Sequence, residues 1–385
     1  MNFELNQDQI AFEDMARVFA SNVFASNAAE WDQKQIFPID ALRQAGEMGF
    51  CGIYCPEDIG GLGLSRLDAS IIFEQLAMGC TSTTAFITIH NMVTWMIADF
   101  GNEKTRQNWC PDLTSGNKLG SYCLTEPNAG SDAASLKTTA RRDGDNYILN
   151  GSKIFISGAG STDVLVVMAR TGAEGPGGIS AFAVDAKSAG IGFGRKEEKM
   201  GWNSQPTRMI TFDDVVVPAL ALLGQEGEGF KIAMKGLDGG RINIASCSVG
   251  TAQAAFNRAR DYMHERKQFG RELATFQALQ FKLADMATDL VAARLMVRMA
   301  AAKFDAKHAD KTTYCAMAKR FATDVGFNIA DEALQIFGGN GYMKEYPLER
   351  YVRDNRVHRI LEGTNEIMRV IISRRVAMEN MSSLV

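Results

Sequence analysis

The sequence lacks the cysteine and histidine spacings that indicate a disulfide framework or a metal site. Its seven cysteines are scattered over 385 residues and form no C-x-x-C pair. We therefore expect free thiols in a reducing compartment. The four histidines also lie far apart in the sequence, without the paired spacing of a zinc site. We expect no bound metal.

Three motifs of common enzyme classes are absent as well. Despite 36 glycines, the sequence contains no G-x-G-x-x-G dinucleotide fingerprint and no G-x-x-x-x-G-K-[ST] phosphate loop. A G-x-S-x-G nucleophile elbow is also missing. If the protein is an enzyme, we expect an organic cofactor, bound without a Rossmann unit, to supply its chemistry.

Charge of neither sign is concentrated in one part of the chain. The formal net charge is −4 and charged residues make up 22%, without the basic cluster that nucleic acid binding requires. The stretch between Glu74 and Asp99 has no formal charge, but it contains too many polar side chains for a membrane span. The first residues resemble neither a signal peptide nor a transit peptide. We expect a bacterial cytoplasmic protein, or a mitochondrial matrix protein if a presequence has been removed.

The character of the sequence changes twice, which predicts three domains. Residues 1–115 show helical spacing of apolar residues. Residues 116–225 combine short β-rich runs with glycine and proline turns, as expected of an antiparallel sheet. Residues 226–385 have no proline before Pro347 and show long helical periodicity, which predicts a helical bundle. The predicted fold class is therefore α+β multidomain, with helices, then a sheet, then helices.

Start signals are present for three helices of the first domain. Asn6 with Gln9 resembles a capping box, and Ser65 with Asp68 predicts the capped start of another helix. Pro38 suits the first turn of a helix because its fixed φ is already helical.

Four segments carry the residues best suited to binding or catalysis. They are Tyr122–Asp132, Arg266–Gly270, Gln335–Tyr342 and Ile360–Arg369. The first is a tight turn of small residues, the second offers a cation for phosphate oxygens, and the third places glycines at a helix end. Taken singly, the first segment fits a capped loop and the second an interhelical salt bridge better than a ligand site. The third fits a helix stop, although a stop needs only one glycine and several glycines suggest that another group approaches the backbone.

The fourth segment contains a candidate general base. Glu362 follows two apolar residues, and a carboxylate in apolar surroundings has the raised pKa that a base near neutral pH requires. The same side chain equally suits the N-terminus of the helix that follows, where a negative charge is stabilising. The residues alone leave both interpretations open.

Together, in this order and spacing, the four segments resemble the acyl-CoA dehydrogenase flavoprotein family over essentially the whole chain. Residues 201–208, 239–248 and 351–354 resemble the branch of the family that acts on isobutyryl-CoA in valine breakdown. The resemblance implies an N-terminal α-helical domain, a middle β domain and a C-terminal four-helix bundle, with FAD at their junction. It further implies α,β-dehydrogenation of an acyl-CoA, an electron-transfer flavoprotein as electron acceptor, and a homotetramer.

The resemblance also implies a role for individual residues. Glu362 matches the catalytic base, whereas the position that supplies the base in some members is Gly240, which cannot abstract a proton. The matching FAD positions are Tyr122, Leu124, Thr125, Ser131, Phe155, Ile156, Ser157, Thr364, Asn365 and Glu366, with Arg266, Gln268, Phe269, Phe276, Gln277, Gln335, Ile336, Phe337, Gly338 and Gly339 reaching FAD from a neighbouring subunit. The matching acyl-CoA positions are Ser131, Asp238, Arg241, Gly363 and Arg374, with Thr84, Ala85, Thr88 and Met92 as candidates for the floor of the acyl pocket.

Two departures from the family pattern leave alternatives open. Asn128 replaces a usual glycine, and asparagine also tolerates a left-handed turn. Phe155 replaces a tryptophan common beside the flavin, so butyryl-CoA and 2-methylbutyryl-CoA stay alternative substrates. A flavin oxidase or monooxygenase and a non-catalytic FAD-binding paralogue are further alternatives, and the presence of Glu362 speaks against both.

Overall fold

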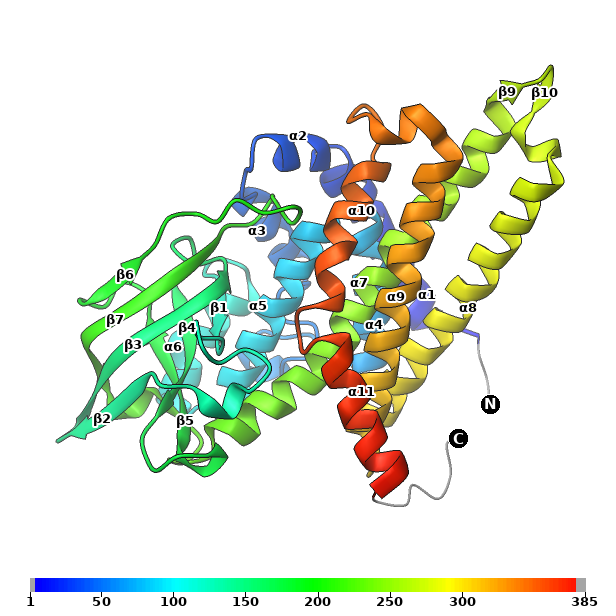
Figure 1. The fold of residues 1–385 in the computed structure, drawn as a ribbon. Helices are drawn as coiled ribbons and strands as arrows, with labels where there is room; N and C mark the ends of the chain where they lie inside the picture. The colour runs from blue at the N-terminus through cyan, green and yellow to red at the C-terminus, as the bar shows by residue number, and fades with distance from the viewer. Residues whose placement is uncertain (1–3, 379–385) are drawn as a thin grey trace.

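The structure, a computed structural model, describes residues 4–378. Residues 1–3 and 379–385, where the first and the last predicted domains begin and end, lie outside the described residues. Helices come first along the chain, a sheet follows, and long helices complete it (Figure 1). This order is the one that the sequence predicts.

Among the described residues, the N-terminal part contains six α-helices. They are α1 (Gln7–Phe19), α2 (Ala28–Gln33), α3 (Ile39–Glu47), α4 (Arg66–Gly79), α5 (Thr81–Phe100) and α6 (Glu103–Thr114). Asn6 and Gln9 form a reciprocal capping box, as do Ser65 and Asp68, which confirms both predicted helix starts. Pro38 is the N-cap of α3 and not a residue of its first turn. The uncharged stretch forms the buried helix α5.

The middle part is a sheet that is mainly antiparallel. Its strands are β1 (Gly120–Cys123), β2 (Thr139–Asp143), β3 (Asn146–Ser157), β4 (Val164–Arg170), β5 (Ile179–Asp185), β6 (Ile191–Phe193), β7 (Thr207–Pro218) and β8 (Leu222–Leu223). The order is β6-β7-β3-β2-β4-β5-β8, and β1 pairs with β4 in parallel. Because β1 runs along β4 beside α5, the loop that leaves β1 begins at the junction with the helices.

The C-terminal part consists of helices, and a small hairpin joins its first two long helices. The elements are α7 (Gly229–Glu265), β9 (Lys267–Gln268), β10 (Arg271–Glu272), α8 (Gln277–Asp305), α9 (Lys311–Phe337), α10 (Leu348–Arg356) and α11 (Asn365–Ser373). Helix α7 packs against α4, α5, α8 and α9. Small residues permit this close packing: a Cβ on Gly250 would lie 2.1 Å from the carbonyl oxygen of Glu74.

Among residues 4–378, no helix is long and apolar enough to cross a membrane. All seven cysteines are buried and unpaired, which confirms that they form no disulfide framework.

Arg353 joins three distant parts of the chain. From α10 it forms a salt bridge of 2.6 Å with Asp32 of α2 and another, of 2.5 Å, with Glu349. It also donates to the carbonyl oxygen of Met200, in the segment between β6 and β7, at 3.2 Å. The side chains of Arg353, Asp32 and Glu349 are all less than one-fifth exposed. Because desolvated charges are costly when a partner is lost, removal of Arg353 alone should be strongly destabilising.

We expect Arg353→Met to lower the free energy of unfolding by about 3 kcal/mol, because it leaves two buried carboxylates without their cation. Chemical denaturation measures the change. Arg17→Met is a matched control, since the Arg17–Asp14 pair is 57% and 61% exposed, and an exposed pair contributes about 0.5 kcal/mol. Equal effects of the two variants would contradict the assigned role of Arg353.

Candidate active site

The candidate base lies in a turn between α10 and α11. Glu362 has φ +57° and Gly363 has φ +87°, so two consecutive residues adopt the left-handed conformation. For a glutamate this conformation costs of order 1–3 kcal/mol, and it persists only where the surroundings impose it. Arg241 of α7 donates its Nε to the carbonyl oxygen of Glu362 at 3.3 Å, and Lys319 of α9 donates its Nζ to that of Gly363 at 2.8 Å. Two helices therefore hold the turn.

The carboxyl group of Glu362 is buried and incompletely paired. Its Oε2 atom has no hydrogen-bond partner among the described residues. Burial raises the pKa of this carboxyl group to about 7, and the positive charges of Arg241 and Lys319 only partly oppose the shift. The group therefore changes charge close to neutral pH, which is the property that a general base requires.

Gly240 of α7 makes the space for this carboxyl group. A Cβ on Gly240 would lie 2.5 Å from Oε2 of Glu362, closer than non-bonded atoms approach. Residue 240, which the resemblance matches to an alternative position of the base, is thus in direct contact with the candidate base Glu362. A side chain at residue 240 and the observed placement of Glu362 exclude each other.

A second loop, residues 124–131, is held beside the sheet by a buried ion pair. Lys153 of β3 donates to Glu126 at 2.7 Å and to the carbonyl oxygen of Leu124 at 3.0 Å. Glu126 also accepts the backbone N–H groups of Lys137 and Thr138. Burial opposes the ionisation of Glu126, but Lys153 and these hydrogen bonds outweigh it and lower the pKa of the carboxyl group. The loop is therefore pinned to the strand that carries the predicted flavin residues.

The turn within this loop does not adopt the left-handed conformation that an asparagine would tolerate. Glu126 and Ala129 exchange backbone hydrogen bonds of 3.1 Å in both directions. Asn128, between them, is not among the described residues with positive φ. An asparagine in place of glycine therefore causes no backbone strain here.

Unpartnered polar atoms and an exposed ring indicate that a ligand completes this site. Among the described residues, the buried hydroxyl oxygens of Tyr122 and Thr84 have no hydrogen-bond partner, like Oε2 of Glu362. Burial raises the pKa of Tyr122, and the charge of Glu362 adds to the shift. Phe155 is 66% exposed and has φ +57°, between the half-buried Ile154 and the buried Ile156 of β3. Because buried polar groups almost always have partners, these unpartnered atoms fit a bound polar aromatic group such as FAD.

The remaining predicted acyl-CoA residues divide into a buried group and an exposed group. Asp238 and Arg241 form a buried salt bridge of 2.7 Å beside the turn of residues 360–364, called the base turn. Ala85 belongs to a buried cluster that Leu361 packs against. Thr84, Thr88 and Met92 are also buried on α5, whereas Ser131 and Arg374 are exposed.

The predicted FAD residues likewise lie in two places. One set lies on β1, in the loop of residues 124–131, on β3 and at the start of α11: Tyr122, Leu124, Thr125, Phe155, Ile156, Ser157, Thr364, Asn365 and Glu366. The other set lies on the hairpin β9–β10 and the start of α8 (Arg266, Gln268, Phe269, Phe276, Gln277) and at the end of α9 (Gln335–Gly339). From Gly240 to the end of α7 at Glu265 is roughly 37 Å at 1.5 Å per residue. One chain alone does not bring the two sets together (Figure 1).

Sequence patterns alone do not identify three polar residues that support the site. Lys153 and Lys319 are fully buried, and Asp324 contacts both ends of the base turn. A lysine between alanines on an apolar helix face, as Lys319 is, would have been the available signal. The partners of all three residues are distant in the sequence.

Comparison with known proteins identifies the family of this chain. Residues 6–117, 121–215 and 227–377 match the N-terminal, middle and C-terminal domains of acyl-CoA dehydrogenase. The mitochondrial isobutyryl-CoA dehydrogenases of Bos taurus and Dictyostelium discoideum are 56% and 55% identical to it, over 97% and 98% of this chain and 90% and 91% of theirs. The structure of butyryl-CoA dehydrogenase from Megasphaera elsdenii superimposes with a TM-score of 0.94 at 39% identity, covering 98% of this chain and all of that one. The chain belongs to the acyl-CoA dehydrogenase family.

Proposed function

We propose that this protein oxidises isobutyryl-CoA to methacrylyl-CoA with FAD, and that Glu362 is the base. The observation that carries the proposal is the buried, unpartnered carboxyl group of Glu362, which titrates near pH 7 beside Gly240. The two isobutyryl-CoA dehydrogenases at 55–56% identity support the choice of substrate. Members of the family bind FAD, and the protein is an FAD-dependent oxidoreductase.

Glu362 would remove the α-proton of the thioester. In the ionised form its carboxylate is a stronger base than a carboxylate in water, because burial raises its pKa. FAD, when bound, accepts a hydride from the β-carbon. The surrounding residues exclude water from Glu362 and fix the direction of its side chain, so that the proton transfers to Oε1 or Oε2 of Glu362.

The backbone at Glu362 also suits stabilisation of the negative charge that develops on the thioester oxygen. No acceptor among residues 4–378 pairs with the N–H of Glu362. A preorganised donor of this kind typically contributes about 3–4 kcal/mol to transition-state stabilisation. Arg241 holds the carbonyl oxygen of the same residue, which fixes the peptide plane that follows Glu362 and restrains the backbone of the turn.

We propose that FAD binds between the pinned loop and the base turn, against Tyr122, Leu124, Thr125, Ser131, Phe155, Ile156, Ser157, Thr364, Asn365 and Glu366. The second set of FAD residues would meet the pyrophosphate and adenosine side from a neighbouring subunit of a homotetramer. Phe269 is 94% exposed, and a Cβ on Gly338 or Gly339 would meet no other atom within 4 Å. Such open backbone and aromatic surface suits contact with a ligand and a partner.

The substrate would contact Ser131, Asp238, Arg241, Gly363 and Arg374, with Thr84, Ala85, Thr88 and Met92 around the acyl chain. Ala85 supports this placement, because Leu361 packs against the buried cluster to which Ala85 and Trp202 belong. An electron-transfer flavoprotein is the proposed acceptor. Seven buried, unpaired thiols support a reducing compartment such as the bacterial cytoplasm or the mitochondrial matrix.

An acyl-CoA panel tests the proposal and separates it from its alternatives. The purified protein is expected to be yellow, and isobutyryl-CoA should bleach it anaerobically faster than butyryl-CoA or 2-methylbutyryl-CoA does. A single methylene contributes only about 1–3 kcal/mol of discrimination, so the rates of all three must be compared. Equal rates would contradict the isobutyryl assignment, and rapid oxygen consumption by the reduced protein would favour an oxidase.

The base assignment predicts a pH dependence and its loss. Because only the ionised carboxylate accepts a proton, the bleaching rate should rise with pH through about 7 and become constant above it. Glu362→Gln should retain bound FAD and lose at least a hundredfold in rate, since a positioned base contributes about 10²–10⁴-fold. Stopped-flow absorbance measures both effects. Full turnover by this variant would contradict the assignment.

Gly240→Ala should inactivate the enzyme without unfolding it. The new methyl group would meet the end of the Glu362 side chain, which can move away, rather than rigid backbone. A displacement of about 1 Å can reduce the rate a hundredfold. FAD content and thermal unfolding should stay close to wild type, as in the control Gly172→Ala, whose Cβ would make only an ordinary contact of 3.4 Å. Wild-type activity of Gly240→Ala would show that Glu362 does not act from the observed position.

A further inference from the structure

The base turn adopts a conformation that it cannot maintain by local interactions. Residues 360–364 form no helix or strand, and Glu362 and Gly363 are both left-handed. Strain of this kind persists only where surrounding groups over-determine the conformation. The contacts of residues 360–365 with the neighbouring helices must therefore fix the position of the base.

Lys319 makes the shortest of the contacts to the two left-handed residues. It lies in α9 with its side chain fully buried. Its Nζ donates to the carbonyl oxygen of Gly363 and to Oδ1 of Asn365, both at 2.8 Å. Lys319 forms no salt bridge with a carboxylate of residues 4–378. A buried ammonium group is costly, so its hydrogen bonds to this turn are its main local compensation.

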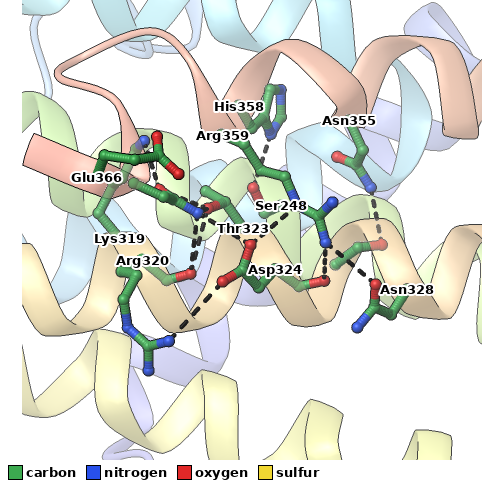
Figure 2. A network of polar contacts seen from close by, with 12 residues as sticks. Ser248, Lys319, Arg320, Thr323, Asp324, Asn328, Asn355, His358, Arg359 and Glu366 are labelled. Carbon is green, nitrogen blue, oxygen red and sulfur yellow. Dashed lines mark hydrogen bonds and ion pairs between the residues drawn. The ribbon is translucent and has the colours of Figure 1, made fainter. Parts of the chain in front are cut away.

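Helix α9 holds the turn a second time, through Asp324. Arg359, before the base, forms a salt bridge of 2.9 Å with Asp324. Asn365, after the base, donates its Nδ2 to Asp324 and to Thr323, both at 3.0 Å. Figure 2 shows Lys319, Thr323 and Asp324 along the side of α9 that faces the segment with Arg359 and Glu366. The turn is thus attached to α9 on both sides of Glu362.

We propose that Lys319 is a positioning residue for the base. By binding Gly363 and Asn365 it fixes the left-handed turn, and with it the direction of the Glu362 carboxyl group, and its positive charge favours the ionised carboxylate. The inference rests on the proposed function of Glu362. It assigns no contact with substrate or FAD to Lys319 itself.

The charges around Lys319 give the direction of the electrostatic effect. Burial lowers the pKa of Lys319 to about 7, Glu362, Asp324 and Glu366 oppose this shift, and Arg241 adds to it. In return, the ammonium group lowers the pKa of Glu362, which burial raises. Removing the charge of Lys319 should therefore raise the pKa of Glu362 further, so that the base ionises at a higher pH.

Two variants separate the clamp from the charge. Lys319→Met removes the charge and both hydrogen bonds at similar length. Lys319→Gln also removes the charge but retains an amide donor, and it serves as the second test should Lys319→Met fold poorly. Asn355→Ala is the matched control, because Asn355 makes a comparable buried hydrogen bond of 3.1 Å from α10 to the carbonyl oxygen of Gly326 in α9, outside the base turn.

Hydrogen exchange of the full-length proteins reports on the turn independently of activity. In Lys319→Met the backbone amides of residues 360–366 should exchange about tenfold faster than in wild type, and in Lys319→Gln the increase should be smaller. The control should leave exchange in residues 360–366 unchanged. Wild-type exchange in both Lys319 variants would overturn the proposal.

Anaerobic bleaching by isobutyryl-CoA gives the second measurement. Lys319→Met should reduce the maximal bleaching rate about tenfold or more, change the half-saturating substrate concentration little, and move the midpoint of the pH profile upward. Asn355→Ala should retain the wild-type midpoint even if it unfolds at a lower temperature. An unchanged rate and midpoint in Lys319→Met would overturn the proposal. Absence of bleaching in wild type would contradict the proposed function instead, and the exchange data would still decide whether Lys319 holds the turn.

Discussion

The site depends on keeping one carboxyl group dry while leaving it able to ionise. Glu362 meets this requirement because its side chain enters the space that Gly240 leaves open, where burial raises its pKa to about 7. Full desolvation without nearby positive charge would keep the group protonated at neutral pH. Arg241 and Lys319 supply that charge, and both bind the backbone of the same turn. Electrostatic balance and backbone position are therefore provided by the same two side chains.

A buried lysine holds an irregular segment on both the helical and the sheet side of the site. Lys153 in β3 and Lys319 in α9 are both fully buried, and each donates to a backbone carbonyl oxygen of an irregular segment. Their electrostatics differ: Lys153 pairs directly with Glu126, whereas Lys319 has amide and carbonyl partners. Irregular segments have no helix or strand hydrogen bonds to fix them, so charged donors from rigid elements take over this function.

The sequence predicted those features that depend on neighbours in the chain. The two capped helix starts, the three-part order of helices, sheet and helices, and the helix that follows Glu362 agree with local residue types and spacing. The parallel pairing of β1 with β4 and the role of Lys319 could not be predicted, because each depends on which distant segments meet. Lys319 precedes its partner Gly363 by 44 positions, and Arg353 follows Asp32 by 321. Helical periodicity identifies a buried face but not the carbonyl oxygen opposite it.

The contact between residue 240 and residue 362 limits how such a site can change during evolution. A carboxylate introduced first at residue 240 would collide with the Glu362 side chain, and loss of Glu362 first would leave the pocket without any proton acceptor. Transfer of the proposed base between residue 240 in α7 and the turn at residue 362 is therefore favoured by paired substitutions, or by a relaxed duplicate gene in which an inactive stage is tolerated.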